Sequence, residues 1–120
     1  MTLKECYAAL GGDYENVTSR LPSEKFVQKF VLKFLNDPSY DLLCSSMESG
    51  SYEEAFRAAH TIKGVCQNLG FTVLGKSSSA LSEALRGGYT PEADTLIHQV
   101  KEDYQVTAQA IWAFQEGIPE

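Results

Sequence analysis

Residues 55 to 70 separate into a polar and an apolar set with the period of an α-helix, and this division constrains the fold of the chain most strongly. With about 100° of rotation per residue, Lys63 and Gly64 project on the same side as His60, and Gln67 follows one turn later. The opposite side carries only small or apolar residues, namely Ala55, Ala58, Ile62, Val65, Cys66 and Leu69. A helix of this kind buries its apolar face and keeps the polar one in water. The segment therefore predicts a core helix that displays a histidine.

The neighbours of His60 suit a residue that accepts a phosphoryl group. An exposed imidazole is largely neutral at pH 7 and then has a nucleophilic ring nitrogen. Lys63, one turn away, sets an ammonium group against phosphoryl oxygens. Gly64 removes a side chain beside the imidazole, although glycine inside a helix costs about 1 kcal/mol relative to alanine. Close approach by another macromolecule explains a glycine at this position.

At these residues the sequence resembles the histidine-containing phosphotransfer (HPt) family of phosphorelays. The family pattern is His, any residue, an aliphatic residue, Lys and Gly, then small and polar residues that end in an aliphatic residue and Gly. The run from His60 to Gly64 and on to Leu69 and Gly70 matches this pattern at every fixed point. The likeness extends from Ser23 to Gln115, because the flanking segments fit the four-helix bundle of the family.

The resemblance implies a role for each matched residue. His60 would carry a phosphoryl group received from a receiver-domain aspartate, Lys63 would stabilise its charge, and Gly64 would admit the partner. Many members have a glutamine on the following helix that hydrogen-bonds the imidazole, and Ser82 aligns with it here. The implied partners are a response-regulator receiver domain, a hybrid histidine kinase, or both. The resemblance implies no cofactor and no metal ion in this domain, since the metal belongs to the receiver.

We predict that four more residues of the same helix contact the partner: Phe56, Arg57, Gln67 and Asn68. Phe56 and Arg57 each have an alternative that involves no partner. Phe56 is either an aromatic anchor for a partner or a side chain tucked against a neighbouring helix. Arg57 either attracts an acidic surface or pairs with Glu53 or Glu54. For His60 itself the alternative is a solvent-facing histidine without a role, which is how we interpret His98.

The remaining pattern predicts an all-α fold, an up-and-down four-helix bundle with additional short N-terminal helices. A single HPt-like domain would occupy residues 1–120, with short helices over about 1–22 and the bundle over about 23–116. Caps and helical spacing predict seven helices, at Leu3 to Leu10, Tyr14 to Arg20, Ser23 to Leu35, Tyr40 to Met47, Ser51 to Leu69, Thr72 to Arg86 and Thr90 to Gln115. We expect the apolar stripe of Phe26, Phe30 and Phe34 to lie in the core. Leu42 should also point inward, and Ser51 with Glu54 has the spacing of a capping box.

Composition excludes several classes of function. The formal net charge is −6, which disfavours nucleic acid or an anionic membrane as the main partner. No apolar run approaches the ~20 residues that cross a bilayer. The three cysteines lack metal-site spacing, and the chain has no nucleotide-binding signature. We therefore expect a cytoplasmic monomer that acts as a phosphoryl carrier and phosphoprotein, without kinase activity of its own.

Two alternatives to a freestanding phosphotransfer protein remain at this point. The first is a helical interaction module that docks a receiver domain or another signalling partner without being phosphorylated. The second is the phosphoacceptor domain of a larger kinase, which is disfavoured if Met1 and the segment 117–120 are natural ends.

Overall fold

The computed structural model describes residues 1–118, which contain seven α-helices and no strand. The helices are α1 (Leu3–Leu10), α2 (Tyr14–Arg20), α3 (Glu24–Phe34), α4 (Ser39–Ser49), α5 (Tyr52–Leu69), α6 (Thr72–Leu85) and α7 (Pro91–Glu116). The predicted all-α class is confirmed, and the seven helices lie at the predicted places along the chain. Residues 119 and 120, which the sequence analysis used as part of a chain end, lie outside the described residues. No helix in the described part of the chain is both long and apolar enough to span a membrane.

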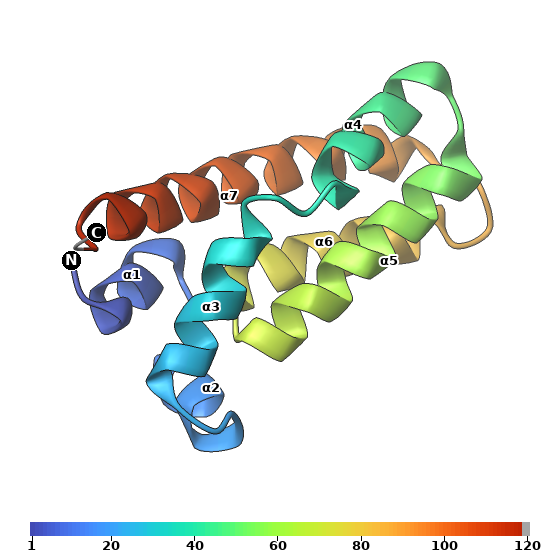
Figure 1. Cartoon of the computed structure of the whole chain (residues 1–120). Coiled ribbons are helices and arrows are strands. Elements are labelled where there is room, and N and C mark those ends of the chain that lie inside the picture. The colour runs from blue at the N-terminus through green and yellow to red at the C-terminus, as the bar shows by residue number, and fades with distance from the viewer. Residues whose placement is uncertain (119–120) are drawn as a thin grey trace.

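The helices α4 to α7 run in alternating directions and form the bundle (Figure 1). The most extensive contacts join α5 to α6, α4 to α5, and α6 to α7, as expected for an up-and-down order. The N-terminal helices are additional to this bundle. Helix α1 packs against α7, while α3 leads into α4 at an angle and touches both α5 and α7. Helix α5 therefore has packed neighbours on two sides and leaves a third side to solvent.

The C-terminal end of α5 is fixed by the segments that precede the bundle. The Tyr7 hydroxyl donates a hydrogen bond of 2.6 Å to the Leu69 carbonyl. The Arg20 Nη2 donates to the carbonyls of Gln67 and Asn68, at 3.3 and 3.0 Å. These carbonyls belong to the last turn of the helix and have no partner within it, so side-chain donors from α1 and α2 satisfy them. The short N-terminal helices thus anchor the helix that carries His60.

The apolar stripe of α3 is only partly in the core, which contradicts the expectation for Phe26. Val27, Val31 and Phe34 are buried, whereas Phe26 is 38% exposed and Phe30 is half-buried. The buried residues follow the i, i+4, i+7 spacing of one narrow face, because α3 has only limited contact with α5 and α7. Phe26 and Phe30 lie at the edge of that face, with ring centroids 4.8 Å apart.

Two local predictions around α4 are also wrong. Leu42 is 44% exposed, because α4 packs mainly on α5 and buries the side that carries Leu43. Ser51 does precede α5, but its side chain makes no capping hydrogen bond. Its Oγ lies 3.0 Å from the Ser49 Oγ instead. Gly50, which has φ of 75°, ends α4 in the left-handed conformation, and α5 begins directly after Ser51 without a capping box.

Candidate functional site

The structure places His60 on the solvent side of α5, about midway along the helix. Its imidazole is exposed, whereas the adjacent Ala59 and the nearby Ile62 are buried. The predicted apolar face is buried except for Val65, which is half-buried. Burial of that face fixes the rotation of α5 about its axis, and this rotation determines which residues surround the histidine.

Gly64 leaves the surface beside His60 open. A methyl group built at Gly64 would meet no atom within 4 Å. Packing within the domain therefore gives no reason for glycine at this position, and what glycine provides is a flat outer surface. Lys63 is half-buried, and it forms no ion pair within residues 1–118. Its ammonium charge is thus available beside the imidazole.

Phe56 contacts both the histidine and the neighbouring helix. Its ring stacks on the His60 ring with centroids 6.0 Å apart and planes at 24°. The Arg86 guanidinium, just past the end of α6, lies 5.4 Å from the Phe56 centroid. The side chain is half-buried, so it retains area that a partner can cover. The two alternatives offered for Phe56 are therefore compatible, since it packs toward α6 and still borders the imidazole.

Arg57 forms the ion pair that was offered as the alternative to partner contact. Its Nη2 lies 2.6 Å from the Glu53 Oε1, one turn back on α5. Both side chains are largely exposed, so the pair is screened by solvent and is easily exchanged for another anion. Arg57 remains a proposed partner contact.

The residue aligned with the family glutamine makes no hydrogen bond to the imidazole. Ser82 is buried, and its Oγ has no hydrogen-bond partner. The next residue, Glu83, is exposed on the surface that His60 shares with α6. Its pKa is lowered first by the hydrogen bond from Arg86 and the charge of that residue, and to a smaller extent by the charges of Lys63 and His60. Sequence reasoning missed Glu83 and Arg86, because sequence spacing does not indicate which face of α6 adjoins α5.

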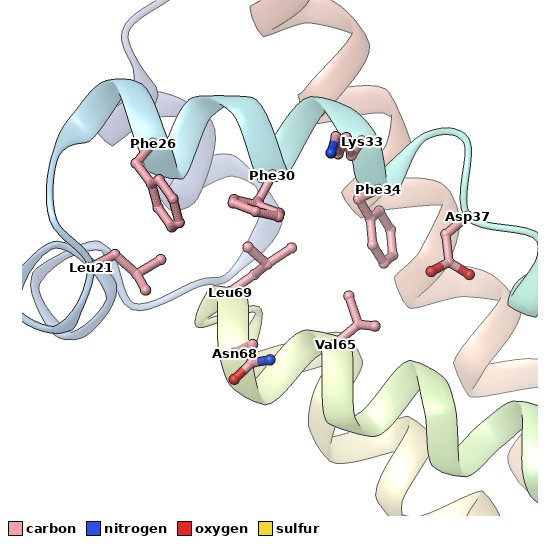
Figure 2. Close-up of a pocket in the computed structure, with 9 residues that line it drawn as sticks. All are labelled: Leu21, Phe26, Phe30, Lys33, Phe34, Asp37, Val65, Asn68 and Leu69. Carbon is pink, nitrogen blue, oxygen red and sulfur yellow. The ribbon is translucent and has the colours of Figure 1, made fainter.

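A groove lies between α3 and the C-terminal half of α5 (Figure 2). Its volume is about 370 Å³, and it is lined by Leu21, Phe26, Phe30, Lys33, Phe34, Asp37, Val65, Asn68 and Leu69. Figure 2 shows Phe26 and Phe30 directed from α3 toward Leu21 and Leu69. Gln67 lies on the other side of α5, in a hollow that it shares with Lys76 and Ser79. Gln67 and Asn68, which were both predicted to contact the partner, therefore line different hollows on the two sides of α5.

The comparison with protein families identifies the chain. The family model described as Hpt domain matches residues 36–110, which is more than half of the chain and includes all of α5 and α6. The chain belongs to the Hpt domain family. Searches of curated proteins and of solved structures found no match. Membership assigns this Hpt domain to histidine phosphotransfer in a phosphorelay.

The remaining cysteines, acidic residues and second histidine of this Hpt domain can be compared with the surroundings of His60. Within residues 1–118, no group of three or more His, Cys, Asp or Glu side chains is arranged to hold a metal ion. Cys66 lies on the buried side of α5, and burial raises the pKa of its thiol to about 12. A thiol that stays protonated is a poor nucleophile at neutral pH. His98, the other histidine, is exposed on α7 and also has a lysine three residues later, Lys101, but Glu102 stands four residues after it, where Gly64 follows His60.

Proposed function

We propose that His60 is the phosphoacceptor of this Hpt domain and exchanges a phosphoryl group with receiver-domain aspartates. One observation carries the proposal. His60 is exposed next to Gly64, where the surface is open enough for another protein to bring an active-site aspartate to the imidazole. Lys63 supplies a positive charge one turn away, where phosphoryl oxygens would lie. The domain thus provides a nucleophile, a counter-charge and access.

The transfer step needs little from this chain beyond position and charge. The lone pair of one imidazole nitrogen of His60 forms a bond to phosphorus. The P–O bond of the aspartyl phosphate breaks at the same time, and its electron pair stays on the departing carboxylate. Lys63 stabilises the negative charge on the phosphoryl oxygens during this exchange. The reverse step passes the group to another aspartate by the same bond changes.

The proposed partner is a receiver domain of a response regulator, of a hybrid histidine kinase, or of both. Support comes from the surface on the Gly64 side of α5. Asn68 follows Gly64 by one turn and lines the α3/α5 groove, where Phe26 exposes apolar area. A groove of this size with an exposed aromatic at its edge suits apolar side chains of a docking helix. The neighbouring Lys33 would favour an acidic flank on that helix.

The alternative function is a helical interaction module that docks the same partner without phosphorylation. The displayed surface of α5 and the groove would serve such a module equally well. The two functions differ only in whether His60 is modified. Replacement of His60 therefore separates them, provided that the variant still binds its partner.

The chain has two histidines, and this allows a matched experiment. Wild type, His60→Gln and His98→Gln are incubated with phosphorylated receiver domains and with phosphoramidate, and the intact mass is measured. We expect one acid-labile phosphoryl group on wild type and on His98→Gln, and none on His60→Gln. His60→Gln should still bind the receiver. Folded wild-type protein that gains no mass from any donor would support the interaction module instead.

A further inference from the structure

The packing of α5 on α6 places Glu83 opposite the centre of the site. At one end of this interface Gln67 shares a hollow with Ser79. At the other end Phe56 lies against Arg86. Ser79, Glu83 and Arg86 are at positions i, i+4 and i+7, so they share one face of α6. Because the two helices are antiparallel, Glu83 lies opposite the part of α5 between Gln67 and Phe56, which contains His60 and Lys63.

Arg86 fixes the Glu83 carboxylate at this place. Its Nη2 donates to Oε1 at 2.6 Å and its Nε donates to Oε2 at 3.3 Å, a two-point contact. The same guanidinium lies over the Phe56 ring, which in turn stacks on the His60 ring. The two side chains of the pair are 57% and 59% exposed, so solvent and salt reach them. The carboxylate is therefore held near the imidazole, and its charge is partly screened.

We propose that the charge of the Glu83 carboxylate shortens the lifetime of the phosphoryl group on His60. The proposal rests on the proposed role of His60. A phosphoryl group carries between one and two negative charges at neutral pH, so the Glu83 carboxylate repels it while Lys63 attracts it. The repulsion is relieved when the group leaves. Glu83 thus disfavours the phosphorylated state relative to the free histidine and keeps the group transferable.

The group can leave by two routes with the same bond changes at histidine. In hydrolysis a water oxygen bonds to phosphorus, the N–P bond breaks, and its electron pair returns to the imidazole nitrogen, releasing inorganic phosphate. In onward transfer an aspartate carboxylate takes the place of water. Both routes remove negative charge from the neighbourhood of Glu83. Its replacement should therefore slow spontaneous hydrolysis and shift the transfer equilibrium toward phosphohistidine.

The experiment compares Glu83→Gln with three full-length controls after phosphorylation of each protein. The readout is the half-life of the phosphoryl group on His60. We expect Glu83→Gln to lengthen it about two- to five-fold at low ionic strength, since the interaction between exposed charges is weak. The substitution also frees the Arg86 guanidinium from its ion pair, and the attraction of this positive charge for the phosphoryl group should lengthen the half-life as well. Glu83→Asp, which keeps the charge, should stay near wild type, and so should Glu102→Gln, which makes the same charge change on α7. Lys63→Gln should shorten the half-life.

Ionic strength separates an electrostatic role from a structural one. The difference between Glu83→Gln and wild type should shrink markedly in 1 M salt, where exposed charges are screened over about 3 Å. Equal half-lives at low salt would overturn the role of Glu83 while leaving the proposed role of His60 intact. A difference that persisted in 1 M salt would also overturn it. A wild-type protein with no phosphoryl group on His60 would overturn both proposals at once.

Discussion

Helix α5 has two faces that differ in purpose. The domain needs one of them for folding and does not need the other. On the buried face Ile62 packs in the core, and the neighbouring helices fill the space around it. On the displayed face His60 and Gly64 are exposed, and Gly64 has open space around it. Substitutions on the first face should change stability, and substitutions on the second should change transfer. One helix thus separates the two requirements by the direction in which its residues point.

The two glycines of the family pattern show the same contrast. Gly64 has helical geometry, and a methyl group built on it would meet no atom of the domain within 4 Å. Any need for glycine at this position therefore comes from outside the domain. Gly70 ends α5 with φ of 72°, and a methyl group there would lie 3.0 Å from the Asp13 carbonyl oxygen. Its own carbonyl accepts a 2.8 Å hydrogen bond from the Asp13 N–H. Gly70 is therefore required by the turn between α5 and α6, whereas Gly64 is explained by a partner.

The largest expected effect tests the buried face. Ile62→Ala removes three carbons from a side chain that is 3% exposed, and it should lower the free energy of unfolding by about 3 kcal/mol. Urea denaturation measures this loss. The folded fraction should still accept a phosphoryl group from phosphoramidate at close to the wild-type rate. Loss of phosphorylation in protein that is shown to be folded would mean that the two faces are not independent.

The next effect tests the displayed face. Gly64→Leu should reduce the rate of transfer from a phosphorylated receiver about 100-fold, because a bulky side chain displaces the reacting groups. Phosphorylation by phosphoramidate, which is small, should change far less. Stopped-time assays with both donors give the two rates. Equal reduction with both donors would argue that Gly64 acts on the histidine itself and not on partner access.

A smaller pair of opposite effects tests the glycine comparison. Gly70→Ala should cost ~1–2 kcal/mol of unfolding free energy, because a side chain is unfavourable at positive φ. Gly64→Ala should raise the same quantity by up to ~1 kcal/mol, because alanine favours a helix. Thermal unfolding of the two variants beside wild type gives the signs. A destabilised Gly64→Ala protein would show that Gly64 has a structural role.

The smallest effect concerns the thiols. Burial raises the pKa of Cys6 to about 11 and that of Cys66 to about 12, from 9.0 for a free thiol. Both thiols favour the folded state below about pH 9, and this contribution is lost as the pH rises toward 12. At pH 8 an alkylating reagent should modify the half-buried Cys44 and spare the other two. Rapid modification of Cys66 in the native protein would contradict the buried position of its helix face.

The order of helices and the display of His60 were predictable because both follow from local spacing. The signals for helix position lie within a few residues of each other in the chain. They are the helical period, Thr2 as a cap, and the glycines after α1 and α5. The exposure of Phe26 and Leu42 was not predictable. Each stands in an apolar run that looks like core, and the width of the buried face depends on how many helices pack against α3 and α4.

The parts of the site that come from a second helix also could not be predicted from the sequence. Alignment with the family indicated Ser82, yet the structure buries Ser82 and brings Glu83 and Arg86 to the surface beside His60. Successive residues of a helix point about 100° apart. An alignment that is wrong by one residue therefore places the wrong side chain beside His60. The groove could not be predicted from the sequence for a similar reason, because its walls come from two helices, α3 and α5.

The most direct test of the account is to locate the phosphoryl group on wild-type protein after exchange with a phosphorylated receiver domain. Fragmentation mass spectrometry under conditions that preserve phosphohistidine assigns the modified residue. We expect a single modification at His60, on the peptide that also contains Lys63 and Gly64, with His98 unmodified. A phosphoryl group on His98, or on any residue other than His60, would contradict it.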